Sequence, residues 1–208
     1  EILAKARNTD VLKLWSGLGY NSRALRLKKA AEVLVREYKN RMPQEKEKLI
    51  SLPGVGPYTA GAVRVFAFDL PDIFLETNIR TVLIHEFFPR KKAVDDKALL
   101  HHAELVLPEE DFRGWYSALM DYGSYLKSEG FSKNERVKGY IKQSRFRGSN
   151  REVRGAIMRL LIEKKNITVK EKDLTRLFSK ERLEKALEGL LREKIIAKTK
   201  GRYHLVSM

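Results

Sequence analysis

Two glycines close together are the first feature of this sequence that could do chemistry. Gly54 and Gly56 belong to the run Leu52-Pro53-Gly54-Val55-Gly56-Pro57, which is too tight for anything but a hairpin. Glycine lets successive backbone amides point outward, and the helix expected just beyond adds its N-terminus. The combination predicts a site for a phosphate oxygen that is indifferent to base sequence. The alternative is an ordinary turn between two helices.

A single carboxylate follows the hairpin. Glu76 is the only acidic residue between Asp72 and Glu86, on the approach to a helix expected over 78–88. In a water-poor pocket, such a carboxylate can stabilise a developing positive charge. The alternative is structural: Glu76 caps the helix and interacts with its dipole. From the residues alone, we favour capping.

The charge of the chain is unevenly distributed. Its 208 residues carry 42 Lys+Arg and 27 Asp+Glu, a net charge of +15. Residues 1–126 hold 19 basic and 17 acidic residues, whereas residues 127–208 hold 23 and 10. A nearly neutral body with a basic C-terminal third predicts a polyanionic partner, nucleic acid ahead of an anionic membrane surface. The alternative is a general enrichment in lysine.

Composition excludes several function classes. The sequence has no cysteine, which rules out a disulfide scaffold, a thiolate zinc site, an iron–sulfur cluster and a cysteine nucleophile. No apolar run approaches the roughly 20 residues that span a bilayer, and no signal peptide is recognisable. We therefore expect a soluble protein of the cytoplasm or nucleoid. The chain opens at Glu1 inside an apolar-periodic pattern, so we expect the natural protein to begin earlier.

The elements that must position these residues are helical in the first 126 residues. Apolar spacing predicts helices over 10–18 with Asp10 as a cap, beyond Ser22 with Ser22 as a cap, and over 43–52, 58–68, 78–88, 95–105 and 112–126. Residues 127–148 are polar, basic and punctuated by glycine, which predicts a linker or extended arm. Helices over 151–163, 172–178 and 180–192, with short strands over 167–169, 195–197 and 203–206, follow the order of a winged helix domain.

Four motifs of the chain resemble the helix-hairpin-helix DNA glycosylase superfamily, and within it the MutY-type adenine DNA glycosylases. They are Gly17-Leu18-Gly19-Tyr20, Leu52 to Gly61, Leu75-Glu76-Thr77-Asn78-Ile79-Arg80-Thr81-Val82-Leu83, and Leu119-Met120-Asp121-Tyr122-Gly123. The expected fold is mainly α: a helix-hairpin-helix glycosylase domain over 1–126 without its N-terminal helix, a basic arm over 127–148, and a small α/β winged helix domain over 149–208.

The resemblance implies an activity and the residues that carry it. It implies a monofunctional glycosylase of base-excision repair that cleaves the N-glycosidic bond of a flipped base, adenine paired with guanine or oxidised guanine. Glu76 stands where the family has its catalytic aspartate. Tyr58 stands where bifunctional members have a lysine that forms a Schiff base. Tyr58 and Asn78 are then expected to hydrogen-bond around the reacting sugar or its 3′ phosphate. A half-buried aromatic is the alternative for Tyr58.

The resemblance also implies the DNA-contacting residues. Tyr20 lies in the intercalating turn, with Asn21 where a second tyrosine is usual. The predicted DNA contacts are Tyr20, Asn21, Arg23, Leu52, Gly54, Val55, Gly56, Thr59, Arg145, Arg147, Arg151 and Arg154. The expected partner is double-stranded DNA with a mismatch or lesion, bound by a monomer without a membrane.

Two family features are absent from this sequence. The general-acid glutamate of the family lies upstream of Glu1, and the first cysteine of its iron–sulfur cluster would match Lys127. We therefore expect no cofactor and no metal site, apart from a monovalent cation at the hairpin. A non-catalytic binder of damaged or kinked DNA is the first alternative function. A winged-helix transcriptional regulator is the second, and it leaves Glu76 unexplained.

Overall fold

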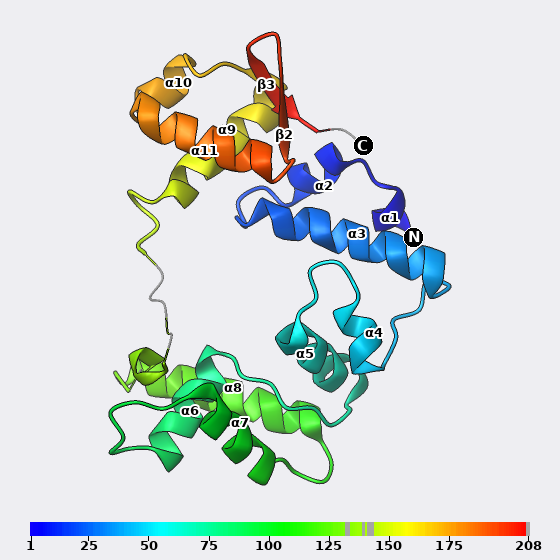
Figure 1. The fold of residues 1–208 in the computed structure, drawn as a ribbon, viewed down its shortest axis with the longest axis vertical. Coiled ribbons are helices and arrows are strands. Elements are labelled where there is room, and N and C mark those ends of the chain that lie inside the picture. Colours follow the sequence, from blue (N-terminus) through cyan, green and yellow to red (C-terminus); the bar gives the residue numbers. More distant parts are fainter. Residues whose placement is uncertain (132–133, 139, 141–143, 207–208) are drawn as a thin grey trace. The chain divides into compact units, whose positions relative to one another are not determined.

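Figure 1 shows the computed structural model, which describes residues 1–131, 134–138, 140 and 144–206. Its internal contacts divide the chain into two units. One, here called the wing unit, joins Glu1–Arg41 to Ser144–Met208, and the other, the hairpin unit, is Met42–Gln143. The domain limits that the sequence suggests, 1–126, 127–148 and 149–208, remain a proposal.

The hairpin unit is built of helices. In chain order they are α4 (Lys46–Ile50), α5 (Pro57–Phe68), α6 (Thr77–Phe87), α7 (Asp96–Leu105), α8 (Phe112–Ser128) and the short 3₁₀ helix η1 (Asn134–Arg136). Helices α6 and α8 lie side by side (Figure 1). Their apolar faces enclose a core that includes Ile79, Leu83 and Tyr116, each at most 1 % exposed. Burial of these side chains is the main force that holds the site-bearing end of α6 against α8.

Local signals explain where these helices begin. Pro57 occupies the first turn of α5, where its missing N–H costs nothing. Asp95 and Asp111 cap α7 and α8 by accepting hydrogen bonds from Ala98 N at 2.7 Å and Gly114 N at 3.0 Å. The helical prediction for this part of the chain is confirmed, with α8 ending at Ser128 and not at Leu126.

The wing unit combines helices with a small sheet. Its elements are α1 (Ile2–Lys5), α2 (Asn8–Leu14), α3 (Asn21–Glu37), α9 (Asn150–Lys164), β1 (Asn166–Ile167), α10 (Lys172–Thr175), α11 (Lys180–Arg192), β2 (Ile196–Thr199) and β3 (Arg202–Leu205). The strands are antiparallel in the order β1-β3-β2. Helix, short strand, two helices and a two-stranded wing appear as predicted, and the fold class is confirmed.

The first 41 residues share a core with the C-terminal elements. Leu12 of α2 and Ala24 of α3 are buried in one apolar cluster with Val153, Ile157 and Leu183 of α9 and α11. The sequence gives no local signal for this packing, because each helix displays only that it has an apolar face.

Several element boundaries differ from the prediction. Helix α4 begins at Lys46 and not at Pro43, α10 ends at Thr175 and not at 178, and β1 covers Asn166–Ile167 and not 167–169. Helix α2 ends at Leu14 and not at 18, and Asp10 is an internal residue whose carboxylate pairs with Arg7 at 2.8 Å, so it is not the cap. Helix α3 begins at Asn21 with Tyr20 as its N-cap, and Ser22 is not the cap. The segment α1 was not predicted. A helix of four residues buries too little to leave a periodic pattern.

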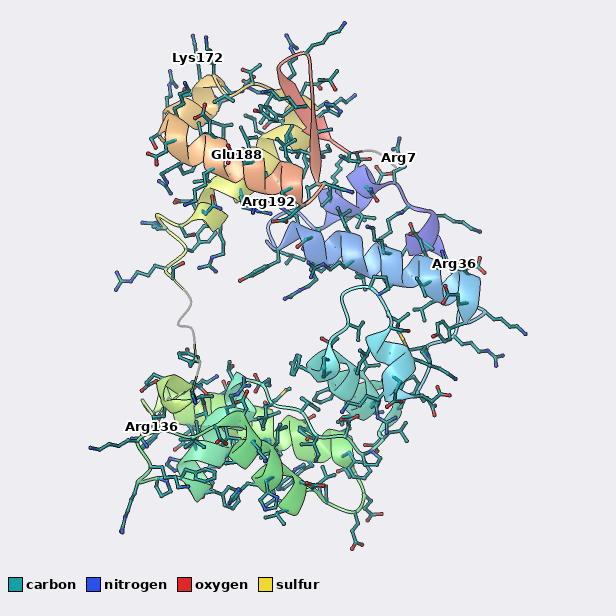
Figure 2. The ribbon with its side chains drawn as sticks, in the orientation of Figure 1. Arg7, Arg36, Arg136, Lys172, Glu188 and Arg192 are labelled. Atoms are coloured by element: carbon teal, nitrogen blue, oxygen red, sulfur yellow. The ribbon has the colours of Figure 1, made fainter. Side chains whose placement is uncertain are left out.

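Surface charge on the C-terminal helices is mixed. Lys172 of α10 and Glu188 and Arg192 of α11 all project from this part of the wing unit (Figure 2). Among the described residues, no helix is long and apolar enough to cross a membrane.

Candidate active site and nucleic-acid interface

The hairpin joins α4 to α5 in the manner that phosphate binding requires. Gly54 has φ of 84°, in the region that favours glycine, and the N–H of Val55 donates to the Leu52 carbonyl at 3.1 Å. Gly56 is the N-cap of α5. The first-turn amides of α5 therefore follow the turn directly, where the helix dipole favours an anion.

The predicted hairpin contacts differ in exposure. Gly54 is exposed, whereas Val55, Gly56 and Thr59 are partly buried. Leu52 is 3 % exposed. Leu52 therefore belongs to the core, and the structure does not support the predicted direct DNA contact from its side chain.

A packed loop carries the chain from α5 to Glu76. A Cβ atom on Gly61 would lie only 3.1 Å from Asp72 Oδ1 and 3.2 Å from Phe74, so this position needs a small residue. The Phe74 ring stacks on Tyr116 at 4.3 Å, and the Tyr116 hydroxyl donates to the Asp72 carbonyl at 3.0 Å. Burial raises the pKa of Tyr116 to about 12. The loop is thus fixed from two sides before it reaches Glu76.

Glu76 caps α6. One carboxylate oxygen, Oε1, accepts hydrogen bonds from the backbone amides of Asn78 and of Ile79, the latter at 2.9 Å. The other, Oε2, accepts from the Thr77 hydroxyl at 3.2 Å. The side chain is partly buried. The structural role that the residues alone favour is therefore present, and it holds the carboxylate in one orientation at the N-terminus of α6.

Tyr58 faces the same region from the first turn of α5. Its ring packs edge-on against Phe74 at 5.6 Å, and 47 % of the residue is exposed. Partial burial, and secondly the negative charge of Glu76, raise the pKa of Tyr58. Tyr58 is thus a half-buried aromatic whose electrostatic environment includes the Glu76 carboxylate, and it stays protonated at neutral pH.

Lys127 is the residue of this site that sequence reasoning did not identify. In the last turn of α8, its ammonium donates to Asn78 Oδ1 at 2.5 Å and to Thr77 Oγ1 at 3.0 Å. Burial lowers the pKa of Lys127, and the negative charge of Glu76 partly offsets this. The sequence places Lys127 at the start of a basic segment, and its role depends on a contact between helices 49 residues apart.

Two further residues hold α6 in place. A Cβ on Gly123 would lie 2.3 Å from the Asn78 carbonyl oxygen, so glycine is what lets α8 approach α6 this closely. Asn134 of η1 is 3 % exposed, and its amide donates to the Thr77 carbonyl at 3.2 Å and the Thr81 hydroxyl at 3.0 Å. The motif Met120-Asp121-Tyr122-Gly123 could have indicated the first of these, since it is part of the resemblance. Asn134 lies in none of the motifs, so nothing in the sequence indicated its contacts with α6.

The turn around Tyr20 lies in the wing unit. Gly17 and Gly19 have φ of 93° and 71°, Tyr20 itself has φ of 49°, and Trp15 Nε1 donates to the Gly19 carbonyl at 2.8 Å. Tyr20 is 54 % exposed, with the Arg23 guanidinium 5.5 Å from its ring centre. This fixed turn thus presents an aromatic side chain to solvent.

Asn21 is less accessible than predicted. As the first residue of α3 it is 9 % exposed. A direct DNA contact from Asn21 would therefore use the little of its surface that remains open beside the Tyr20 turn.

A hollow of about 690 Å³ in the wing unit joins this turn to α9. Its lining includes Tyr20, Asn21, Phe146, Arg151 and Arg154. The structure therefore brings together four of the predicted DNA contacts from segments 130 residues apart in the sequence. An open hollow with aromatic and guanidinium groups at its wall suits stacked bases and phosphates.

The arginines of the predicted arm differ in how they are held. The Arg154 guanidinium pairs with Glu193 at 2.7 and 2.6 Å, which fixes it across α9 and the end of α11. Arg151 donates to the Ser144 carbonyl. Arg145 and Arg147 are exposed and do not line the hollow. The rest of the predicted arm lies partly at residues 132–133, 139 and 141–143, outside the described residues.

Metal ligation finds no support in the described part of the chain. Among those residues, no group of three or more His, Asp or Glu side chains is arranged to hold a metal ion. The sequence contains no cysteine to ligate an iron–sulfur cluster.

The hairpin matches a known motif family, and nearly the whole chain is similar to known proteins. Residues 37–66, which contain the hairpin, match the helix-hairpin-helix motif family. An adenine DNA glycosylase of Mycobacterium tuberculosis is 31 % identical over 223 residues, with 97 % of this chain and 73 % of that protein covered. An adenine DNA glycosylase of Mycolicibacterium smegmatis is 28 % identical, with 97 % and 75 % covered.

Matches that cover less of the chain agree with this assignment. An adenine DNA glycosylase of Mus musculus is 46 % identical over 82 residues, which are 39 % of this chain and 16 % of that protein. The structure of a thermostable thymine-DNA glycosylase is 27 % identical with a TM-score of 0.52, covering 64 % of this chain and 63 % of that one. Together with the hairpin geometry, these similarities show that the chain belongs to the adenine DNA glycosylase family, base-excision repair enzymes that hydrolyse N-glycosyl bonds.

Proposed function

We propose that this chain is a monofunctional glycosylase that removes adenine paired with guanine or oxidised guanine in double-stranded DNA. The base preference is supported by the similarity of the chain to adenine DNA glycosylases. The observation that carries the proposal is the Glu76 carboxylate, bound by two backbone amides at the N-terminus of α6. A carboxylate held this way cannot turn away when positive charge develops near it.

The chemistry follows from that fixed charge. Breaking the bond between base and sugar leaves positive charge on the sugar, which a preoriented carboxylate stabilises without reorganising. We expect Tyr58, protonated at neutral pH, and Asn78 to hydrogen-bond the sugar or its 3′ phosphate. A phenol forms no Schiff base with the sugar, so Tyr58 supplies no strand-cutting step. Water then adds to C1′ of the sugar and the departing adenine takes up a proton, so the product is an abasic site in an intact strand.

DNA binding draws on both units. The backbone amides of Gly54 and Gly56 and of the first turn of α5 bind a backbone phosphate, and the hairpin carbonyls bind a monovalent cation. Tyr20 fills the gap left by the flipped base, at a flipping cost of a few kcal/mol that protein contacts offset. Arg145, Arg147 and the hollow beside Arg151 follow the phosphate backbone. We propose that the chain acts on chromosomal DNA inside the cell, as a monomer.

Base release from a labelled duplex tests the activity. Adenine opposite guanine or 8-oxoguanine is expected to be released in a single turnover, and Glu76→Gln is expected to abolish release while leaving DNA affinity unchanged. Glutamine keeps an acceptor for the cap and removes only the charge. Asp95→Asn is the matched control, because Asp95 caps α7 of the same unit. It is expected to excise at the unmodified rate.

Two outcomes would contradict the proposal. Full excision by Glu76→Gln would remove this carboxylate from the mechanism. Tight binding of the mismatch duplex with no base release at any protein concentration would leave the non-catalytic binder of damaged or kinked DNA.

A further inference from the structure

Lys127 occupies a place where a lysine is costly. Its ammonium lies at the N-terminus of α6, bonded to Asn78 Oδ1 and Thr77 Oγ1. That end of a helix already carries partial positive charge, which disfavours a cation. Lysine side chains normally extend into water, and this one is partly withdrawn from it. The arrangement is sustained only by the acceptors it meets and by the negative charge of Glu76.

The contact with Asn78 fixes which end of its amide is available. A protonated lysine has three donors and no acceptor, so it binds the amide oxygen and never the NH₂ group. With Oδ1 engaged at 2.5 Å, the NH₂ group of Asn78 points away from Lys127. Asn78 is therefore prepared as a hydrogen-bond donor, which suits a phosphate or sugar oxygen.

The contact with Thr77 orders a second group. Thr77 Oγ1 accepts from Lys127 at 3.0 Å, and its own proton is then directed to Glu76 Oε2 at 3.2 Å. Lys127, Thr77 and Glu76 thus form a chain of hydrogen bonds with one direction, in which each bond strengthens the next. The carboxylate oxygen that the helix cap leaves free is held by this chain.

We propose that Lys127 is a positioning residue for base excision, which orients the Asn78 amide as a donor and holds Glu76 Oε2 through Thr77. It acts through these residues and does not itself touch the nucleotide. This inference rests on the proposed function, because it assigns Glu76 and Asn78 to the reaction. It extends that function to a residue of α8 for which neither the motifs nor the comparisons give a role.

The test compares two substitutions at one position with a distant control. Lys127→Met keeps the length of the side chain and removes its charge and donors, whereas Lys127→Arg keeps both. Lys97→Met is the matched control, because it removes one positive charge from an exposed position on α7 of the same unit. The single-turnover excision constant, the Kd for an uncleavable duplex and the thermal midpoint are measured for each.

A positioning role predicts a loss of rate without a loss of affinity. Lys127→Met is expected to lower the excision constant on the order of a hundredfold, as misplacing reacting groups by about 1 Å does. Its Kd and that of Lys97→Met are expected to match each other, and Lys127→Arg is expected to restore most of the rate. Rescue by arginine separates charge-assisted hydrogen bonding from simple packing.

If Lys127→Met unfolds, Asn78→Asp replaces it as the test. Aspartate keeps an acceptor for Lys127 but replaces the NH₂ donor by oxygen. We expect a stable protein with a much reduced excision constant, and a rate equal to the unmodified chain would overturn the inference.

Three further outcomes would overturn it. An unchanged rate in Lys127→Met, with Glu76→Gln inactive, would refute the role of Lys127 and leave the proposed function intact. A weakened Kd with an unchanged rate would make Lys127 a DNA contact. A borohydride-trapped adduct that disappears in Lys127→Met would make it a nucleophile. Full activity of Glu76→Gln would instead refute the proposed function.

Discussion

At Gly123, α8 lies so close to the Asn78 backbone of α6 that no Cβ atom fits, and adding one methyl group there is a direct perturbation of the site. In Gly123→Ala the new Cβ would lie 2.3 Å from the Asn78 carbonyl oxygen, 2.6 Å from its carbon and 2.8 Å from its Cα. Ordinary contacts between such atoms are about 3.5–4.0 Å. The neighbour is backbone, so it cannot rotate away. The two helices must separate by about 1 Å.

The size of the effect follows from this overlap. Inserting a methyl group into packed structure costs about 1–3 kcal/mol, and each kcal/mol lowers the unfolding midpoint by about 2–4 °C in a chain of this size. Lys127 lies one turn beyond Gly123 on α8, so its bonds to Thr77 and Asn78 lengthen as the helices part. A displacement of about 1 Å at Asn78 and Glu76 is expected to slow excision on the order of a hundredfold.

Thermal unfolding and single-turnover excision of adenine measure the two effects. Gly155→Ala is the control for stability, because it lies inside α9 and its Cβ would meet nothing within 4 Å. It is expected to raise stability by about 0.5–1 kcal/mol, since alanine loses less backbone entropy than glycine. If Gly123→Ala keeps both the midpoint and the excision rate of the unmodified chain, the close α6–α8 contact does not position the site.

Three other predictions concern the cap, the arm and the loop. Glu76→Ala removes the acceptor of two backbone amides and is expected to lower stability by about 1 kcal/mol, whereas Glu76→Gln keeps it; equal urea midpoints for the two variants would contradict the cap. Each phosphate contact steepens the dependence of log K for DNA binding on log salt concentration by about 0.9. Replacing Arg145 and Arg147 by alanine is therefore expected to reduce this slope by about 1.8. An unaltered slope would show that neither arginine contacts a phosphate. Because the pKa of Tyr116 is raised to about 12, its contribution to the free energy of unfolding is fully present below pH 10 and is lost as the pH rises toward 12. An absorbance titration is expected to show one tyrosine that ionises near pH 12, and this transition is expected to be missing in Tyr116→Phe.

Local features of this chain were predictable because they depend on few residues. The hairpin requires a positive φ at Gly54, and Pro57 begins the helix that follows it. Glycine and proline are the residue types that favour these two conformations, so the sequence indicates both features directly. The wing was predictable for the same reason, since short β-prone runs flank the turn at Lys200-Gly201. Glu76 was found as a carboxylate at a helix start, and both of its possible roles were already apparent.

Contacts between helices distant in sequence were not predictable. The basic stretch after Leu126 looks like the start of a solvated arm, yet Lys127 is still helical and turned toward α6. Burial of Asn21 depends on how α3 packs, and the turn that precedes it gives no hint of this. Ser22 resembled a helix cap, but the N-cap of α3 is Tyr20, in a left-handed conformation and two residues earlier.

From the sequence, a helix cap and a catalytic charge are alternative interpretations of Glu76. In the structure the two roles are compatible. The cap occupies Oε1 with two backbone amides, and Oε2 accepts a hydrogen bond from the Thr77 hydroxyl. Because the negative charge is shared by both oxygens, the bonds that anchor Oε1 fix the position of the charge without neutralising it. A carboxylate that must stabilise a transient sugar cation gains most when it does not have to reorient as the charge appears. For the catalytic role that we propose for Glu76, the helix cap supplies this preorganisation, because the Asn78 and Ile79 amides hold the carboxylate in one orientation.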